Sequence, residues 1–429
     1  MRKRKPMRAD GEGRRVLLLM GEARGGIREH ALCLARLADR RRFAITVCGP
    51  ADSRLVSALA QVGVEFIPLR SRLLAGRVVA VRRALGAGFK LVHSHGYRAS
   101  FLAALALWPS RRAAHVCTIH TLLPRDAFGG IGGWLKRRAA AWTLGRCEAV
   151  VAVSNATEAN LRQNFPSLGT RVRTIYNGVD VSQIRPARVR GLLASSLGLE
   201  PNLPLVGTVA RLSPEKGVQV LLEAARLLTD EGVAAEYVIV GDGRERAALE
   251  KMVHGLGLTA HVRFLGERRD IPQLISIFDI LVVPSLSEAF SLVALMGGIL
   301  GVPVVATRSG GIEEILGSEL CTYVPPGDAR TLANGLLAVL RRGWVPTGFL
   351  DEAVEDVAGT AEATFFDEVA EHRWAFSAYE LSEEASPIMG LDESPQGPAR
   401  RALLKRFDAR RMVEETTSLY ESTLDETNS

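Results

Sequence analysis

The chain has 429 residues, of which 47% are hydrophobic and 24% are charged. Such a length exceeds one ordinary domain, and the apolar content is sufficient for two hydrophobic cores. The five cysteines are scattered, odd in number and without metal-type spacing. This pattern favours free buried thiols in a reducing compartment over a disulfide framework or a zinc site.

Charge is distributed unevenly along the chain. Residues 1–182 carry 31 Lys and Arg against 11 Asp and Glu, a balance of +20, whereas the remainder has a balance of −13. A basic half is typical of proteins that meet nucleic acid or an anionic membrane, and it also arises from a high-arginine genome. Zinc-finger spacings and aromatic RNA-binding strands are absent, so nucleic acid is not expected as a partner. An anionic membrane surface or lipid acceptor, and genome bias, are the two interpretations left open.

No stretch has the pattern of a transmembrane helix. The apolar run at 16–20 is too short for a signal-peptide core. The long uncharged run at 289–307 contains Gly297, Gly298, Gly301 and Pro303, and its pattern breaks into helix, turn and strand. We therefore expect a cytoplasmic protein, with a peripheral location on the inner face of the membrane if the basic half binds lipid.

In the first half, apolar runs of strand length alternate with helical patterns. Strands are expected at 15–20, 43–47, 64–68, 89–93, 114–119, 149–153 and 172–176, with a helix at 27–39 after the first. Parallel strands linked by helices form a doubly wound sheet, whose ligands bind at the carboxyl ends of the strands. His120 stands at such an end, and Gly25 and Gly26 follow the first strand, where backbone can approach a ligand closely. A purely structural role is the alternative for His120 and for the two glycines.

Two segments of this half are basic and amphipathic. The segment 70–90 includes Arg77, Arg82 and Arg83, and the segment 128–144 places Lys136 between Trp134 and Trp142. Such faces suit an anionic lipid surface, and an ordinary solvated helix face is the alternative for either segment alone.

The second half opens with a strand at 205–210, a turn, and a helix expected from Glu215 onward. Arg211 and Lys216 lie five residues apart across this turn, so both cations can converge on one anion. The alternative is a helix-start arginine and an unrelated surface lysine.

The stretch 285–307 combines a loop carboxylate with a helix N-terminus. Glu288 precedes a helix that opens near Ser291, and a strand follows at 304–306. A helix N-terminus presents unpaired N–H groups and partial positive charge, which makes it a natural seat for phosphate. Glu288 could then hydrogen-bond sugar hydroxyls while the helix end holds phosphates.

In order and spacing these motifs resemble those of the retaining GT-B glycosyltransferases, glycosyltransferase family 4. The resemblance rests on the glycines after the first strand, the strand-ending histidine, the G-x-x-x-R-x-x-x-x-K-G pattern at 207–217, and Glu288. It implies an α/β GT-B fold of two Rossmann-like doubly wound domains facing a cleft. It also implies catalytic roles for His120 and Glu288 and a donor site that comprises Gly25, Gly26, Arg211, Lys216, Phe290, Ser291, Leu292 and Met296.

One position departs from the family pattern. The family has a second glutamate where this chain has Met296, and in the family that glutamate accepts hydrogen bonds from the donor ribose. We expect weaker or altered donor recognition, with Gly297 and Gly298 bending the helix start or admitting another group to the ribose. The alternative function is a catalytically degenerate GT-B protein that acts as a binding or assembly partner in polysaccharide synthesis.

The expected domains are 1–182 on the acceptor side and 183–342 for the nucleotide sugar. Residues 343–399 contain 13 Asp and Glu and one basic residue, and they are expected to form a partly helical, partly disordered acidic insertion. Residues 400–429 are expected to form a last helix that returns to the first domain.

These interpretations together predict a hexosyltransferase. It would move a sugar from a nucleotide diphosphate sugar to a lipid-linked or glycan acceptor, with retention, in polysaccharide or glycolipid synthesis. No D-x-D triplet occurs in the chain, so no metal site is expected, and the nucleotide sugar is a substrate rather than a cofactor. An epimerase or phosphorylase on the same fold is less favoured, because the Arg-Lys and Glu288 motifs are those of transferases.

Overall fold

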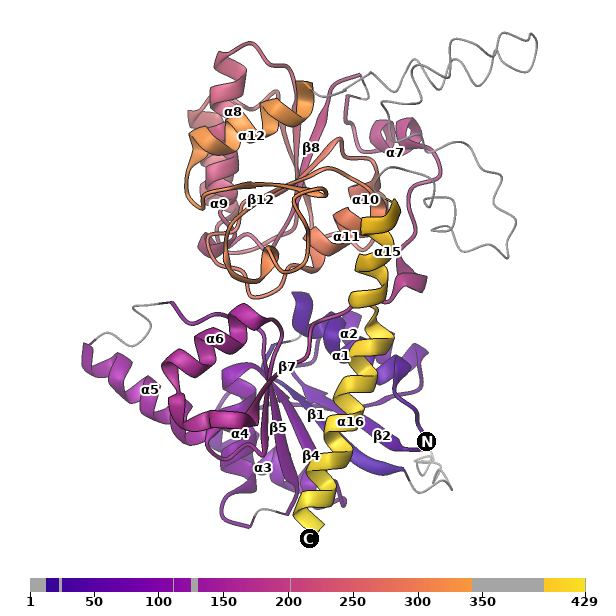
Figure 1. Ribbon diagram of the computed structural model, residues 1–429, viewed down its shortest axis with the longest axis vertical. Helices are drawn as coiled ribbons and strands as arrows, with labels where there is room; N and C mark the ends of the chain where they lie inside the picture. Colours follow the sequence, from indigo (N-terminus) through magenta and orange to yellow (C-terminus); the bar gives the residue numbers. More distant parts are fainter. Residues whose placement is uncertain are drawn as a thin grey trace, which may run out of the picture. The chain divides into compact units, whose positions relative to one another are not determined.

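The computed structural model describes residues 13–22, 25–110, 112–124, 130–200, 202–341 and 397–428. The chain divides into two compact units: unit 1 is Met1–Val179 with Ala409–Ser429, and unit 2 is Asp180–Asp408. Each unit contains one parallel β-sheet with helices on both faces (Figure 1). The α/β class with two Rossmann-like domains is therefore confirmed.

Unit 1 contains a seven-stranded sheet among its described residues, and all of the strand pairs are parallel. In sheet order the strands are β3 (Glu65–Pro68), β2 (Phe43–Gly49), β1 (Arg14–Met20), β4 (Leu91–His95), β5 (Ala114–Ile119), β6 (Ala149–Ala152) and β7 (Val172–Thr174). The helices are α1 (Gly25–Leu37), α2 (Ser53–Gln61), α3 (Leu74–Leu85), α4 (Gly96–Leu107), α5 (Gly130–Leu144), α6 (Asn155–Asn164), the 3₁₀ helix η1 (Pro166–Arg171) and α16 (Ala409–Asn428).

Alternate residues of β1 enter two different cores, as expected for a strand covered on both faces. Val16, Leu18 and Met20 pack with α1 and α16, whereas Leu17 and Leu19 pack with α3 and α4. Figure 1 shows α16, the last helix of the chain, lying across the strands of unit 1. The C-terminal helix therefore completes one face of the first sheet.

Unit 2 contains a six-stranded parallel sheet among its described residues. Its strands in order are β10 (Val262–Gly266), β9 (Glu236–Val240), β8 (Leu205–Val209), β11 (Ile280–Val283), β12 (Val304–Thr307) and β13 (Cys321–Val324). The helices are η2 (Val181–Gln183), α7 (Arg190–Ser196), η3 (Pro214–Lys216), α8 (Val218–Asp230), α9 (Arg246–Gly255), α10 (Ile271–Ser276), α11 (Leu292–Leu300), η4 (Gly310–Ile312), α12 (Ala329–Arg341) and α15 (Gly397–Arg406).

Two consecutive glycines let α11 pack very closely in unit 2. A Cβ at Gly297 would lie 2.5 Å from a methyl of Leu281 on β11, and one at Gly298 would lie 2.8 Å from a methyl of Leu403 on α15. The structure gives these glycines a packing role, and the expectation that they bend the helix start or admit another group to the ribose stays a prediction. They bring α11 close to the sheet on one side and to α15 on the other.

Two element boundaries differ from the sequence prediction. The helix expected from Glu215 begins at Val218, because Pro214–Lys216 forms a 3₁₀ turn that ends at Gly217 in a left-handed conformation, φ 65°. The segment expected as one returning helix from residue 400 is two helices, of which α15 belongs to unit 2 and only α16 belongs to unit 1. The unit junction lies at Val179, near the expected 182, and most of the acidic insertion lies outside the described residues.

Candidate functional site

The predicted donor residues of unit 2 gather at the carboxyl edge of its sheet. Arg211 and Lys216 follow β8, and Glu288 follows β11, its neighbour in the sheet. The turn that carries Lys216 is held against this neighbour, because a Cβ at Gly217 would lie 2.0 Å from the carbonyl oxygen of Pro284. Only glycine fits this left-handed, closely packed position. The local sequence therefore brings the two loops into direct contact.

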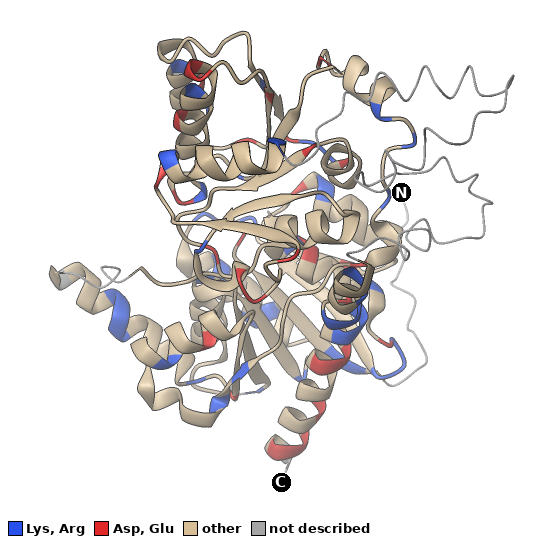
Figure 2. Cartoon of the chain, turned by 45° about the horizontal axis from the view of Figure 1, so that its top comes forward, with Lys and Arg blue, Asp and Glu red and all other residues tan. Residues whose placement is uncertain are grey.

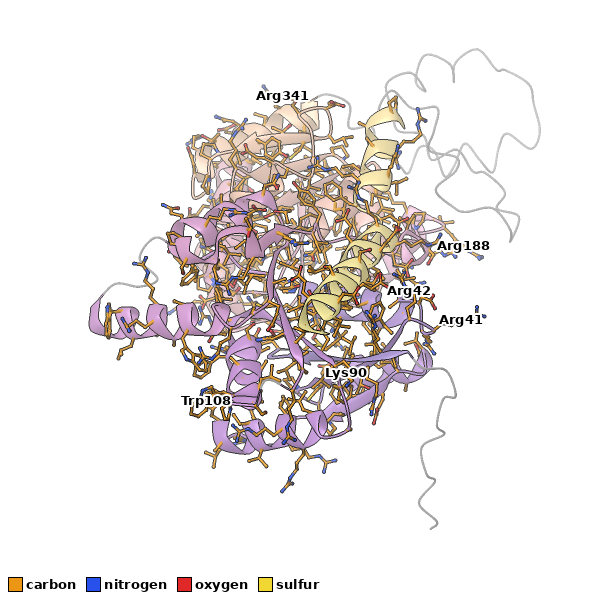
Figure 3. The ribbon with its side chains drawn as sticks, turned by 60° about the horizontal axis from the view of Figure 1, so that its bottom comes forward. Arg41, Arg42, Lys90, Trp108, Arg188 and Arg341 are labelled. Carbon is orange, nitrogen blue, oxygen red and sulfur yellow. The ribbon has the colours of Figure 1, made fainter. Side chains whose placement is uncertain are left out.

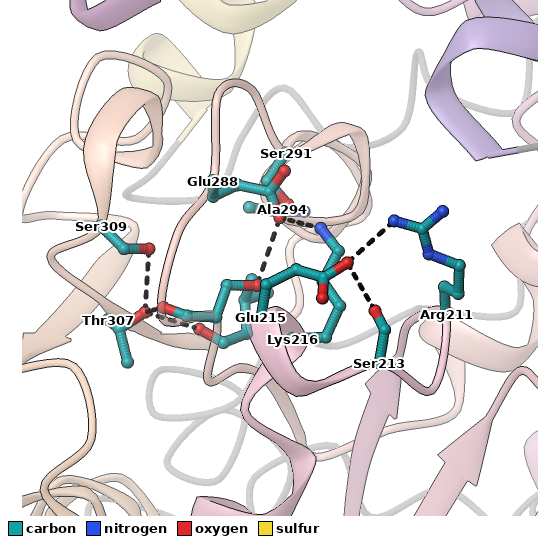
Figure 4. A network of polar contacts seen from close by, with 11 residues as sticks. Arg211, Ser213, Glu215, Lys216, Glu288, Ser291, Ala294, Thr307 and Ser309 are labelled. Carbon is teal, nitrogen blue, oxygen red and sulfur yellow. Dashed lines mark hydrogen bonds and ion pairs between the residues drawn. The ribbon is translucent and has the colours of Figure 1, made fainter. Parts of the chain in front are cut away.

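Lys216 and Glu288 form the central ion pair of this edge (Figure 4). Lys216 Nζ lies 2.5 Å from Glu288 Oε2, and the two side chains are only 22% and 13% exposed. Ser285 Oγ donates a hydrogen bond to the same carboxylate oxygen at 3.2 Å. The lysine and the glutamate that the sequence assigned to the donor are thus in contact with each other.

A second ion pair involves Arg211 and is more exposed. Arg211 Nη2 lies 2.9 Å from Glu215 Oε1, and Ser213 Oγ donates to the same oxygen at 2.7 Å. Partial burial alone would raise the pKa of Glu215, but hydrogen bonds from Ser213, from its own backbone and from Arg211 together lower that pKa. Glu215 is therefore a carboxylate at neutral pH. The sequence analysis did not single out this residue, although it lies between the two predicted cations.

The N-terminus of α11 lies in the same loop as Glu288. Ser291 is the N-cap, and its Oγ accepts a hydrogen bond from Ala294 N at 3.1 Å, as is usual for a helix start. The remaining N–H groups of the first turn and the helix dipole favour an anion here. Thr307 donates to the backbone carbonyl of Ser285 and so ties this loop to the end of β12 (Figure 4).

The other predicted donor residues occupy different environments around this loop. Phe290 is buried and packs edge-on against Phe407, with ring centroids 5.6 Å apart, so a donor would meet its backbone rather than its ring. Leu292 begins α11, and Met296 lies one turn further on and is partly buried. Among the described residues, no group of three or more His, Cys, Asp or Glu side chains is arranged to hold a metal ion.

The predicted residues of unit 1 also lie at the carboxyl edge of their sheet. Gly25 and Gly26 open α1 after β1 and are exposed. His120 directly follows β5. This is the edge at which a doubly wound sheet binds its ligands.

His120 does not stand alone but belongs to a cluster of four histidines. The ring of His120 lies 5.1 Å from that of His30 and 5.4 Å from that of His95, and His95 lies 4.3 Å from His93. His95 Nδ1 and His120 Nε2 share a hydrogen bond of 3.2 Å. The sequence analysis singled out His120 alone among these four histidines. The signal for His30 was a polar residue on the buried face of α1.

The polar partners of the cluster come from distant parts of unit 1. His93 contacts Tyr420 OH of α16 at 2.5 Å and Thr118 Oγ1 of β5 at 2.6 Å. His30 Nδ1 lies 2.8 Å from Asn177 Oδ1. These contacts fix two of the four rings, those of His93 and His30, through residues far apart in sequence.

Burial keeps the histidine cluster neutral. Desolvation lowers the pKa of His30 to about 4, although its hydrogen bond to Asn177 acts in the opposite direction. Burial also lowers the pKa of His93, His95 and His120 well below the ordinary value, and repulsion from neighbouring imidazoles adds to the effect. At neutral pH each ring therefore carries one N–H and one lone pair.

Comparison with known families identifies the class of protein. Residues 24–183 match the family described as Glycosyltransferase Family 4, and residues 192–347 match Glycosyl transferases group 1. The chain is a GT-B glycosyltransferase of the family 4 type. It is therefore a transferase that uses a nucleotide sugar, as the resemblance predicted.

Individual relatives of this glycosyltransferase span most of its length. It is 26% identical over 392 residues to the D-inositol 3-phosphate glycosyltransferase of Corynebacterium urealyticum, covering 86% of this chain and 85% of the relative. It is also 26% identical, over 58% of this chain and 66% of the relative, to UDP-Gal:alpha-D-GlcNAc-diphosphoundecaprenol alpha-1,3-galactosyltransferase of Escherichia coli. Among solved structures, Anabaena HepE in complex with UDP-glucose has a TM-score of 0.70 at 23% identity, covering 95% and 99% of the two chains. That likeness supports the fold.

Proposed function

We propose that this glycosyltransferase moves a hexose from a nucleoside diphosphate donor to a lipid-linked or glycan acceptor with retention of configuration. Arg211 and Lys216 bind the pyrophosphate, Glu288 binds a hydroxyl of the donor sugar, and His120 acts at the reacting face of that sugar. The observation that carries this proposal is the contact between Lys216 and Glu288 beside the N-terminus of α11.

The charges of unit 2 suit an incoming pyrophosphate. Lys216 and Arg211 each contact a carboxylate, Glu288 and Glu215 respectively. A pyrophosphate offers both cations charge-assisted hydrogen bonds, and the helix end adds a third source of positive potential. Released from Lys216, Glu288 is free to accept a hydrogen bond from a sugar hydroxyl. The bound diphosphate can then leave with its charge stabilised by these groups, without magnesium.

The acceptor class is supported by relatives and by the surface of unit 1. The Escherichia coli relative acts, by its name, on a diphosphoundecaprenol-linked sugar. In unit 1, Trp134 and Leu135 of α5 are 54% and 56% exposed, and the following residues Lys136, Arg137 and Arg138 are basic (Figure 2). Exposed aromatic and basic side chains on one helix suit an anionic membrane surface. We therefore propose α5 as the part of unit 1 that contacts the membrane holding the acceptor.

A second helix of the basic half is less suited to this role than the sequence suggested. Arg82 of α3 donates hydrogen bonds to the carbonyl oxygens of Leu105, Ala106 and Trp108 at the end of α4, where Trp108 is exposed (Figure 3). Its guanidinium thus caps a neighbouring helix. Reversing the charge at Arg82 would disturb packing as well as lipid binding, so α5 is the better place for a test. Within the described residues, no helix is long and apolar enough to cross a bilayer.

The test of transfer uses the purified full-length chain and a panel of nucleotide sugars. Calorimetry identifies the donor, and NMR of the sugar transferred to a glycan or polyprenyl-diphosphate acceptor reports its anomeric configuration. We expect one donor to bind and the product to keep the donor's configuration. An inverted product would refute retention, and a chain that binds no nucleotide sugar would refute the proposed function.

Membrane contact is tested by vesicle sedimentation. We expect the chain to bind vesicles that contain phosphatidylglycerol more strongly than neutral vesicles, and increasingly so at low salt. Trp134→Ala with Lys136→Glu should weaken this binding, whereas Lys251→Glu on α9 of unit 2 should not. Equal binding to neutral and anionic vesicles would favour genome bias as the origin of the basic half.

A further inference from the structure

Helix α11 carries the N-terminus of the proposed donor site, yet little in its own sequence stabilises it. The helix has nine residues, Leu292–Leu300, and two consecutive glycines, Gly297 and Gly298, lie in its interior. Short helices are marginally stable by themselves, and glycine is among the least favourable residues in a helix interior. The position of α11 therefore depends on the elements that pack against it.

Helix α15 supplies part of this packing through one of its faces (Figure 1). Arg400, Leu403 and Phe407 are three and four residues apart, which places them on one side of a helix, and all three are buried. Phe407 directly follows α15, and its N–H donates to the Leu403 carbonyl oxygen at 2.9 Å, so the helical turn continues to this residue. Residues of the other side, such as Lys405 and Arg406, are exposed.

Arg400 binds the C-terminal end of α11. Its Nε donates to the carbonyl oxygen of Ile299 at 3.2 Å, and its Nη2 donates to the same oxygen. Carbonyls of the last helical turn have no partner within the helix, and a cation there also complements the helix dipole. Gly301, which ends the helix with φ 73°, leaves room for the guanidinium, because a Cβ at this position would lie 3.0 Å from Arg400 Cζ.

The other two contacts lie nearer to the N-terminus of α11. A methyl of Leu403 lies where a side chain at Gly298 would otherwise be. The ring of Phe407 packs edge-on against that of Phe290, with centroids 5.6 Å apart, and Phe290 directly precedes Ser291, the N-cap of α11. Contacts with one face of α15 thus extend from the last turn of α11 to the residue before its N-cap.

We propose that α15, together with Phe407, positions the N-terminus of α11 for the diphosphate of the donor, with Arg400 and Phe407 as the positioning residues. This inference rests on the proposed function of that helix end. The N–H groups and the dipole of a helix act on an anion within the first turn only, so a displacement of this turn weakens anion binding. Neither positioning residue has to touch the donor itself.

Hydrogen exchange of the full chain, measured by mass spectrometry, tests the positioning directly. We expect Phe407→Ala and Arg400→Met to raise exchange in peptides from residues 288–296, which contain the donor loop and the first turn of α11. Leu249→Ala is the control, because Leu249 is a buried residue of α9 in the core of the same unit, and it should leave these peptides unchanged. Unchanged exchange in Phe407→Ala and Arg400→Met would overturn the proposal whether or not the chain transfers sugar.

Calorimetry with inorganic pyrophosphate and a panel of nucleotide sugars tests the consequence for binding. We expect Phe407→Ala and Arg400→Met each to weaken binding about twofold to thirtyfold, which is the range that a helix N-terminus contributes to binding an anion. Phe407→Leu keeps an apolar side chain against Phe290, and Arg400→Lys keeps a cationic donor for Ile299. Both conservative variants should recover most of the lost affinity.

The outcomes separate this inference from the proposed function. If the wild type binds a nucleotide sugar and Phe407→Ala and Arg400→Met bind it equally well, α15 does not position the donor site and the proposed function stands. If Leu249→Ala weakens binding as much for the same loss in Tm, general destabilisation explains the effect and the inference fails. If exchange at residues 288–296 responds as expected but neither the wild type nor any variant binds a nucleotide sugar, the proposed function fails and the support of α11 by α15 stands.

Discussion

The two sheet edges keep polar groups in the protein interior by different means. In unit 2, Lys216 and Glu288 retain opposite charges and stabilise each other at 2.5 Å. In unit 1, His30, His95 and His120 are desolvated so strongly that their pKa values fall and the rings stay neutral. A charge pair can exchange one partner for an incoming anion, whereas a neutral cluster is suited to orienting hydroxyl groups and is sensitive to acid. This difference leads to separate predictions for the two units.

The largest expected effect is acid destabilisation of unit 1. The pKa of His30 and that of His115 are each lowered from 6.5 to about 4 by burial, so the unfolded chain takes up protons in this range before the folded chain does. The free energy of unfolding is therefore fully retained above pH 6.5 and decreases as pH falls toward 4. At about 1.4 kcal/mol per pH unit, each histidine contributes a loss of roughly 3 kcal/mol.

Hydrogen exchange measured by mass spectrometry at pH 7 and pH 5 can resolve the two units. Peptides from β4 and β5 should lose protection at the lower pH before peptides from β8 and β11 do. His30→Asn should reduce the pH dependence, whereas His254→Asn on the surface of unit 2 should not. Earlier loss of protection in unit 2 would contradict the contrast between the units.

The next largest effect concerns the cations of unit 2. Lys216→Ala and Arg211→Ala should each weaken donor binding in calorimetry by roughly one to two decades, since a charge-assisted hydrogen bond contributes about 1.5–3 kcal/mol. Lys216→Ala also leaves Glu288 beside the donor without its cation. The double variant Lys216→Ala with Glu288→Gln should therefore bind the bare nucleoside diphosphate more tightly than Lys216→Ala alone. Lys251→Ala is the control, and unchanged affinity in both single variants would place the pyrophosphate elsewhere.

Replacing Met296 by glutamate is expected to change donor binding by no more than the cation variants do, and in the opposite direction. A thioether is a weak acceptor, so a carboxylate at this partly buried position should restore hydrogen bonds to the donor ribose. Met296→Glu should tighten donor binding about tenfold to hundredfold, equivalent to roughly 1–3 kcal/mol. Val293→Glu, on the same helix, controls for charge alone. If neither the wild type nor Met296→Glu binds any nucleotide sugar, the non-catalytic partner function is favoured.

Chelation of divalent ions should have the smallest effect of all. If two side-chain cations and a helix N-terminus stabilise the leaving diphosphate, donor binding and transfer should persist in EDTA. Initial rates with and without added magnesium provide the measurement. A strict magnesium requirement would show that the charge pairs of unit 2 are insufficient.

The sequence by itself determined the features whose signals are local. The strand at residues 114–119 was predicted with the bounds that the structure has, because Val116, Thr118 and Ile119 are β-branched residues, which favour a strand. Arg211 and Lys216 lie in one turn, and Glu288 and Ser291 in one loop, so their spacing predicted that the members of each pair lie close together, while the resemblance to family 4 assigned them to a donor site. The expected helix start at Glu215 was wrong because Gly217 adopts a left-handed conformation that spacing does not reveal.

Only the tertiary structure decided what depends on contacts between distant residues. His30, His95, His120 and Tyr420 come from α1, the carboxyl ends of β4 and β5, and α16, and nothing in their spacing along the sequence shows that they meet. The packing role of Gly298 depends on Leu403, and the capping role of Arg82 depends on the end of α4. Residue spacing along a helix or loop gives the neighbours within that element, whereas the partners of a buried side chain are set by which elements the fold brings together.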